Sequence, residues 1–533
     1  MNWLPVALLA VPLLGALLLL APAAATRPGP RVYGLAVSGL VLLLAVVMLV
    51  AFDYGQAGRQ QFELSASWVP GLDLRFHLGV DGISLPLIAL TALLTFLCFA
   101  YLCWGSARGP GQLLRPRQGG GRPRALVFTL LVLEVGMIGT FLALDLLLFF
   151  VFFEIVLIPM YFLIAIWGGR GRRAAAIKFI LYTLLGSVVM LLGLLLIWAQ
   201  TGTLDIVRLA AEHGGGMSRT VQVIAFIAVG LGLAVKTPMW PLHTWLPDAH
   251  TEAPTVGSVL LAGVLLKMGT YGFARIAIPV LPEGAAVIAP WLGVFAVVGI
   301  IYGALACLAQ RDLKRMIAYS SVGHMGFVLL GFATLTTVGI NGALFANVAH
   351  GLITGLLFFL AGAIKERYGT ADMPSLGGGM LAILPHLGSV LTFAAIASLG
   401  LPGLAGFWGE MLALLGAFQP ADGLSRPIFL AFMAIGGLGA VLTAAYFLVM
   451  LSRITHGRPG PPTGDDAGSL VAVGASGGAR PVAIVKPDLR DIRVYEMAAW
   501  VPLVVLILLF GLWPKLLLSL TTPAVQALLG VVS

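Results

Sequence analysis

The sequence predicts an all-α polytopic membrane protein with about 14 transmembrane helices. Of its 533 residues, 59% are hydrophobic and only 10% are charged, and the mean hydropathy is +1.02. This composition excludes an ordinary soluble globular protein. Two further observations agree with it: apolar windows long enough to cross a bilayer recur along nearly the whole chain, and the basic residues gather in every second connection between them.

The apolar windows predict the helices in order. They lie near residues 4–24, 32–52, 83–104, 125–143, 145–167, 177–199, 221–242, 255–277, 287–309, 315–336, 341–363, 379–417, 427–452 and 499–522. The first window could pass for a secretory signal, but Arg27 and Arg31 follow its apolar run instead of preceding it. We therefore expect a retained first helix.

The basic residues predict the orientation of these helices. Of the 31 Lys and Arg residues, 22 fall in connections after odd-numbered windows and five in connections after even-numbered ones. Because positive connections stay in the cytoplasm, we expect both termini on the outer, periplasmic side of the cell's inner (plasma) membrane. The same distribution explains the net charge of +9 through topology, so we expect a lipid bilayer and no nucleic acid as partner.

The seventh window contains a charged residue and a break. Lys236 lies about 15 residues into the apolar run, or roughly 22 Å along a helix, where a charge costs at least about 2.5 to 3.5 kcal/mol. Pro238 and Pro241 follow it, and each leaves a carbonyl one turn earlier without its helical partner. Such backbone is tolerated at membrane depth only where protein or a wet cavity surrounds it.

The twelfth window predicts a second break. It is about 39 residues long, too long for one straight span, and its middle reads Gly-Leu-Pro-Gly at 400–403. Two broken helices five windows apart, helices 7 and 12, fit two inverted five-helix repeats formed by helices 4–8 and 9–13.

This pattern predicts five regions along the chain. They are 1–124 with three helices and a basic cytoplasmic loop, 125–277 as the first repeat, 287–452 as the second, 453–498 as a cytoplasmic loop, and 499–533 with a C-terminal helix. The Gly- and Pro-rich stretches 108–124 and 453–496 read as flexible connectors.

Few ionisable residues remain at depth once the connections are set aside, and seven of them form the candidate set. They are Glu134, Glu154, Lys236, Lys267, His324, His350 and Glu410. Any single member could be half of a structural ion pair, and His324, close to Ser320 and Ser321, suits packing as well as relaying. As a set they suit proton transfer, because burial brings the proton affinities of lysine and glutamate closer together and histidine exchanges protons near neutrality.

Metal and redox chemistry are not expected on this chain. Three cysteines form no CxxC pair, so we expect no cluster, zinc site or disulfide framework and place any redox centre on another chain. Ligand-type side chains also occur in the Pro-rich connection after the seventh window, at His243, Asp248, His250 and Glu252. We expect no metal there, and two lysines at depth disfavour a path for a bare cation.

Five stretches together resemble the antiporter-like subunits of respiratory complex I and the related multi-subunit sodium/proton antiporters. The likeness covers roughly residues 80 to 450, and it rests on Phe149–Tyr161 around Glu154, Lys236–Pro254, Leu260–Gly272 around Lys267, Arg311–Gly326 and Ser398–Glu410. Glutamate at the position of Glu410 is similar to the M-type subunits of complex I, whereas the other types usually have lysine.

The resemblance implies a proton-translocating membrane-arm subunit of NADH–quinone oxidoreductase without cofactors of its own, with neighbouring antiporter-like subunits as partners. It implies that Glu154 and Lys236 form a gating ion pair, that Lys267 is the central relay and that Glu410 is the exit-side donor, joined to Lys267 by His324 and His350. A subunit of a cation/proton antiporter and a structural membrane spacer remain the alternatives.

Overall fold

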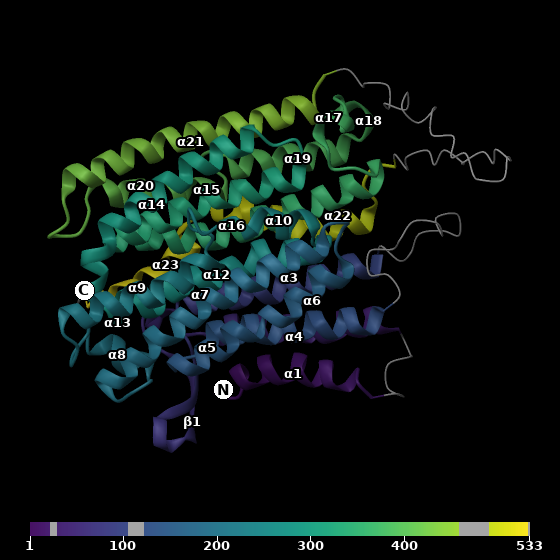
Figure 1. Cartoon of the computed structure of the whole chain (residues 1–533). Coiled ribbons are helices and arrows are strands. Elements are labelled where there is room, and N and C mark those ends of the chain that lie inside the picture. The colour runs from purple at the N-terminus through teal and green to yellow at the C-terminus, as the bar shows by residue number, and fades with distance from the viewer. Residues whose placement is uncertain (22–28, 105–121, 458–489, 531–533) are drawn as a thin grey trace.

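The described part of the chain folds into a bundle of roughly parallel helices (Figure 1). The computed structural model describes residues 1–21, 29–104, 122–457 and 490–530. The first helix begins and the last helix ends near one end of the bundle, which also carries a β-hairpin, and we call it the hairpin end. Most of the two expected connectors, 108–124 and 453–496, lies outside the described residues.

The N-terminal region combines three helices with the hairpin. Helices α1 (Leu4–Leu18) and α2 (Pro30–Ala51) are followed by η1 (Tyr54–Gln56), β1 (Gln61–Val69), η2 (Pro70–Leu72), β2 (Leu74–Val80) and α3 (Ser84–Trp104). The two strands pair antiparallel. Because β1 is largely exposed and lacks an apolar run, hydropathy alone does not reveal it, and the hairpin is an addition to the predicted all-α architecture.

The middle of the chain contains the first of the two predicted breaks. Its elements are α4 (Pro123–Leu142), α5 (Leu146–Ile155), α6 (Leu157–Trp167), α7 (Arg172–Thr201), α8 (Ile206–Ala211), α9 (Arg219–Lys236), α10 (Trp245–Glu252), α11 (Thr255–Leu260), η4 (Leu261–Leu265), α12 (Leu266–Gly272), η5 (Phe273–Ala277) and α13 (Ile278–Val280). Helix α9 ends at Lys236, before the two prolines. The residues expected to form a plain loop after it include the short helix α10.

The second half contains the other break. Its elements are α14 (Pro282–Leu308), α15 (Leu313–Ala333), α16 (Thr337–Tyr368), α17 (Met373–Leu376), α18 (Met380–Ile383), α19 (Pro385–Ser398), α20 (Ala405–Phe418), α21 (Arg426–Ile454), α22 (Val494–Leu512) and α23 (Lys515–Leu528). Helices α19 and α20 are the two halves of the predicted twelfth helix. Gly400 and Gly403 between them have φ of 82° and 94°, a backbone conformation that glycine adopts readily.

The structure confirms a polytopic helical membrane protein. Among the described residues, 11 helices are long and apolar enough to span a membrane, or up to 12 if α22 and α23 form one span. The predicted number was about 14. The count is lower because α1 has only 15 residues and because α19 and α20 have 14 residues each. Helices α22 and α23 meet at 69°, so two C-terminal helices stand where the sequence predicts one.

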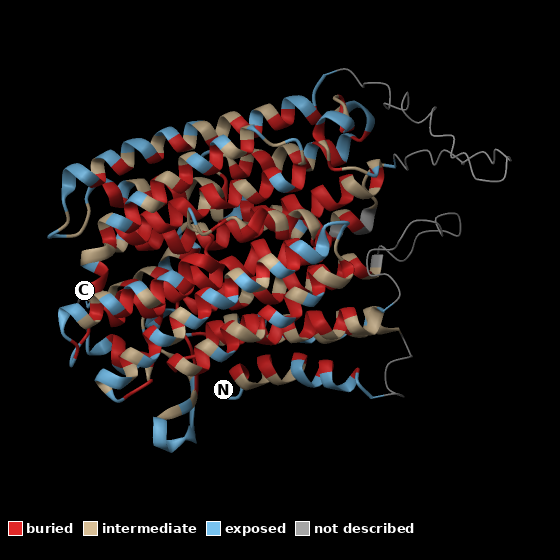
Figure 2. Ribbon diagram, viewed as in Figure 1, coloured by how far each residue is buried: buried red, intermediate tan, exposed pale blue. Residues whose placement is uncertain are grey.

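Burial separates a central group of helices from a more exposed periphery (Figure 2). The segment Thr255–Val280 is entirely buried, whereas only 28% of the most apolar window is buried in Pro30–Ala51 and in Arg426–Ile454. Apolar side chains such as Leu185 and Leu192 are exposed on α7, as expected of a surface that contacts lipid. Lys267 therefore lies on the helix that is most completely surrounded by protein.

Candidate functional site

Lys236 ends α9 with its side chain inside the protein. Its Nζ donates a hydrogen bond of 2.6 Å to the carbonyl oxygen of Phe153 and lies 3.5 Å from the centroid of the Phe153 ring. A cation in the last turn of a helix is stabilised by the negative end of the helix dipole. The ring face adds a cation–π attraction, which is stronger for a buried cation than for an exposed one. These contacts make a buried ammonium tolerable where α9 breaks.

Glu154 lies beside this contact without closing an ion pair. Among the described residues, no oxygen of Glu154 lies within 4.0 Å of Lys236 Nζ, although the two groups interact electrostatically. Oε1 of Glu154 is buried without a hydrogen-bond partner. The expected direct pair is thus replaced by the carbonyl of Phe153, which lies in the last turn of α5, where carbonyls lose their helical partners.

Glu134 is fully buried in α4. Neither of its carboxyl oxygens has a hydrogen-bond partner, which is unusual because buried polar atoms are almost always satisfied by protein or water. In the described part of the chain, no hydrogen bond connects Glu134 to the other predicted site residues. Such a carboxyl fits a site for a water molecule or a transferable proton.

Lys267 is fully buried at the centre of the bundle. Its Nζ hydrogen-bonds to the carbonyl of Ala262 and lies 2.6 Å from Nδ1 of His350 on α16. Ala262 belongs to the π-helical segment η4. The wider π turn disturbs the regular backbone pairing, and such segments occur frequently at functional sites.

Two histidines extend from Lys267 towards Glu410. The rings of His350 and His324 have centroids 5.6 Å apart. His324 Nδ1 then lies 3.0 Å from Oε1 of Glu410. The structure therefore brings Lys267, His350, His324 and Glu410 together in a line, and we call these four residues the central line.

The break between α19 and α20 forms the surroundings of Glu410. Ser398, the last residue of α19, places its Oγ 3.1 Å from Nε2 of His324. A Cβ atom at Gly400 would lie only 3.1 Å from Oε2 of Glu410. The broken backbone thus contacts both members of the His324–Glu410 pair, so its conformation decides where they meet.

Sequence reasoning left two buried polar residues, His250 and Lys314, out of the site. His250 is buried in α10, stacks on Phe358 at 4.4 Å between ring centroids, and has no partner for either ring nitrogen. Lys314, near the start of α15, donates to the carbonyl of Ala253 at 2.8 Å and lies 3.3 Å from Ser258 Oγ. Their positions near predicted helix ends suggested exposed connections. Only the tertiary packing buries them.

The family match and the similar sequences of known proteins point to the same kind of membrane subunit. A family described as NADH:quinone oxidoreductase/Mrp antiporter, transmembrane, matches residues 143–443. The chain is 39% identical to NADH-quinone oxidoreductase subunit M of Rhodobacter capsulatus, covering 92% of this chain and 88% of the relative. It is 37% identical to NADH-ubiquinone oxidoreductase chain 4 of Arabidopsis thaliana, covering 96% and 94% of the two chains.

Solved structures show the same architecture. A chain of respiratory complex I from Thermus thermophilus with bound NADH superposes with a TM-score of 0.81 at 29% identity, covering 99% of this chain and 100% of that chain. A chain of the Mrp complex from Dietzia sp. DQ12-45-1b has the same TM-score at 24% identity, covering 99% and 97%. At that identity, the second likeness concerns the fold.

Proposed function

The chain belongs to the NADH:quinone oxidoreductase/Mrp antiporter family, as an M-type membrane subunit, and on this premise we propose that it moves protons along its buried side chains. Lys236 and Glu154 would control entry to the path, Lys267 would be the central relay, and Glu410 would release the proton. His350 and His324 would connect the last two. The observation that carries this proposal is the central line, because its neighbouring groups approach within 2.6 Å and 3.0 Å at either end.

Proton transfer along the central line requires groups that both accept and release a proton. Imidazole does so near neutrality, and it has two nitrogens. Nδ1 of His350 faces Lys267, while its Nε2 is buried without a partner. The two histidine rings meet edge to face with centroids 5.6 Å apart, so rotation of a ring would bring its nitrogen towards the other ring and let a proton pass in short steps.

The approach of Lys236 to Phe153 suggests how entry could be controlled. The ammonium now contacts a neutral carbonyl and an aromatic ring, while the Glu154 carboxylate acts on it electrostatically without contact. The attraction between opposite charges grows as their distance falls, most strongly at low dielectric constant. A small movement of Glu154 would therefore change how firmly Lys236 keeps its proton. Glu134, which is fully buried, is the further carboxyl that we include in the path.

Two symmetric backbone bridges support the predicted inverted repeats. Asp145 pairs with Asp205 in the first repeat, and Asp312 pairs with Asp372 in the second. The two pairs have the same spacing in the sequence. Each of the four aspartates also caps the N-terminus of a helix with its carboxylate. We infer that the two halves share one architecture, with a broken helix in each.

The electron-transfer chemistry would belong to other subunits of NADH–quinone oxidoreductase. We propose no cofactor or metal on this chain, whose two buried cysteines, Cys98 and Cys307, each donate a hydrogen bond to a backbone carbonyl. Its partners would be the neighbouring antiporter-like subunits of the membrane arm. We place it in the plasma membrane with the hairpin end outside, as the distribution of basic residues predicts. The antiporter alternative is less well supported, because the most similar relatives described above are subunit M and chain 4.

Substitution of the entry residues tests the proposal. Glu154→Ala and Lys236→Ala should each leave the complex assembled and severely reduce NADH–quinone turnover coupled to proton movement. Arg208→Gln is the matched control, because it breaks an exposed ion pair with Glu212 at 2.8 Å. Normal turnover and pumping in both alanine variants would contradict the assignment of Glu154 and Lys236.

A further inference from the structure

Helix α22 contacts the break between α19 and α20 through bare backbone. A Cβ atom at Gly511 would lie 2.2 Å from the carbonyl oxygen of Gly403 and 2.4 Å from Cα of Leu404. Real Cβ atoms do not approach backbone this closely, so no residue other than glycine fits without a shift. The end of α22 therefore presses directly on the turn that separates the two half-helices.

A hydrogen bond fixes the same contact from the other side. Nε1 of Trp408 on α20 donates to the carbonyl oxygen of Gly511 at 2.7 Å. Trp408 lies two residues before Glu410, so the bond ties α22 to the turn of α20 that carries the carboxylate. The break itself contacts the Glu410 side chain at Gly400.

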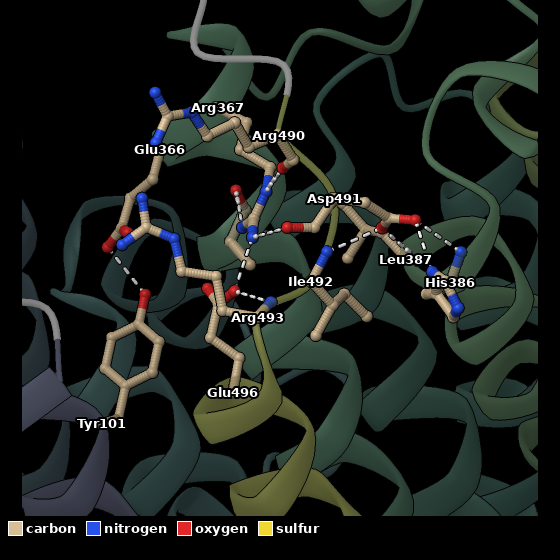
Figure 3. A network of polar contacts seen from close by, with 11 residues as sticks. Tyr101, Glu366, Arg367, His386, Leu387, Arg490, Asp491, Ile492, Arg493 and Glu496 are labelled. Atoms are coloured by element: carbon tan, nitrogen blue, oxygen red, sulfur yellow. Dashed lines mark hydrogen bonds and ion pairs between the residues drawn. The ribbon is translucent and has the colours of Figure 1, made fainter.

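The other end of α22 is anchored to two further helices (Figure 3). Arg367 on α16 forms an ion pair with Glu496 on α22, with Nη2 and Oε2 2.6 Å apart and both side chains nearly buried. Its Nε also donates to the carbonyl of Arg490 at 2.8 Å. Because α16 carries His350, this anchor joins α22 to a helix of the central line.

Asp491, just before α22, binds the start of α19. Its carboxylate accepts hydrogen bonds from the backbone N–H groups of His386 and Leu387 at 2.9 Å and 3.0 Å, and it lies 2.8 Å from Nδ1 of His386 (Figure 3). These are N-capping contacts, which leave the first turn of α19 in a fixed position. The segment 490–512 thus holds α19 at its start and contacts the break just before α20.

We propose that residues 490–512, which we call the brace, set the geometry of the broken helix, and that Gly511 and Trp408 are positioning residues for Glu410. The brace is fastened to α16 and to both half-helices, α19 and α20. These three elements carry His350, Ser398 and Glu410, so a shift of the brace would change the distances within the His324–Glu410 pair. The inference rests on the proposed role of Glu410.

The test compares two tryptophan-to-phenylalanine variants in the assembled complex. Trp408→Phe keeps an aromatic ring and removes the donor to Gly511. Trp198→Phe is the matched control, because Trp198 Nε1 donates in the same way to the carbonyl of Leu72 at 3.0 Å, away from the break. NADH–quinone turnover is measured across pH, since the profile reports the ionisation of essential groups. The titratable groups that act on Glu410 are His324 on α15 and Tyr446 on α21.

If the brace positions Glu410, we expect Trp408→Phe to assemble normally and to move the pH profile of turnover by about 0.5 pH unit. Trp198→Phe should leave that profile unchanged. Gly511→Ala should have the larger effect, and if that variant does not assemble, Trp408→Phe decides alone. An unchanged profile in Trp408→Phe would overturn the proposal. Glu410→Gln separates the proposed role of Glu410 from the proposed role of the brace. Full turnover in Glu410→Gln would contradict the role of Glu410. Loss of turnover in Glu410→Gln, together with an unchanged pH profile in Trp408→Phe, would contradict only the brace.

Discussion

Lys267 and His350 are 83 residues apart in the sequence, and their side-chain nitrogens lie 2.6 Å apart in the structure. Lys267 comes from the buried segment that follows the first break, and His350 comes from α16. Their contact joins the first predicted repeat to the second. Polar side chains therefore follow one another from Lys267 through His350 and His324 to Glu410, as the proposed proton path requires.

Replacement of His350 should interrupt this continuity. His350→Leu has a similar size but offers no nitrogen to Lys267, so we expect coupled turnover to fall on the order of tenfold or more while the amount of assembled complex stays unchanged. The measurement is NADH–quinone turnover in purified membranes, together with the yield of the complex. Full turnover in an assembled His350→Leu variant would exclude His350 from the path.

For proton pumping, a carboxyl that can bind and release a proton at position 410 should matter more than the length of the side chain. Glu410→Asp keeps a titratable carboxyl near His324, whereas Glu410→Gln keeps the shape and loses the exchangeable proton. We expect Asp to retain much more proton pumping than Gln, as measured by acidification in vesicles driven by NADH. Equal activities in the two variants would argue against proton release through Glu410.

A buried ion pair near the hairpin end should stabilise the fold. Arg275 Nη2 lies 2.5 Å from Oδ1 of Asp81, and both side chains are almost fully buried. Breaking such a pair from one side leaves an uncompensated charge and costs about 3 to 5 kcal/mol, so Arg275→Leu should lower the thermal stability of the complex strongly. Arg208→Leu removes an exposed pair and should change the thermal stability little, because water screens such pairs. Equal melting temperatures would contradict this account.

The attachment of the hairpin should depend on pH. Burial lowers the pKa of His77 on β2, but its contacts with the Asp205 and Glu63 carboxylates outweigh burial and hold that pKa above its ordinary value. Burial raises the pKa of Asp205, and its contact with His77 together with backbone hydrogen bonds outweighs this and lowers that pKa overall. The histidine's contribution is therefore complete below about pH 6.5 and is lost as pH rises through its raised pKa. The aspartate's contribution is lost in acid, as pH falls through its lowered pKa.

Hydrogen exchange measures this dependence directly. Amides of β1 and β2 in the intact complex should exchange more readily as the solution becomes alkaline, after correction for the intrinsic rate, and His77→Gln should remove the dependence. Protection that stays constant across the same range in the unmodified protein would show that the His77 contacts do not hold the hairpin.

Much of the architecture follows from the sequence. Lys236, Lys267 and Glu154 stand out because each interrupts an apolar run, where a charge is expensive. The second break is visible because a 39-residue window, about 59 Å as one helix, exceeds a bilayer, and because Gly and Pro occupy its middle. These features are local, so they can be recognised in the sequence without knowing how the helices pack.

Other features depend on contacts between distant residues. Nothing near Ser398 in the sequence indicates His324 as its partner, and Phe153 accepts from Lys236 through a backbone carbonyl that any residue would offer. The Arg275–Asp81 pair joins a predicted helix to a predicted loop. Pro514, the N-cap of α23, marks the bend between α22 and α23 in the sequence. The predicted window 499–522 nevertheless runs across this proline, so hydropathy alone predicts one helix there.

Lys267 offers the most direct test of proton movement through this chain. Lys267→Met keeps an unbranched side chain of similar length and removes the proton-carrying group. In proteoliposomes with the purified complex, the variant should lose most NADH-driven proton transport and coupled turnover. Wild-type rates of both in a fully assembled Lys267→Met complex would contradict a proton path through the central line.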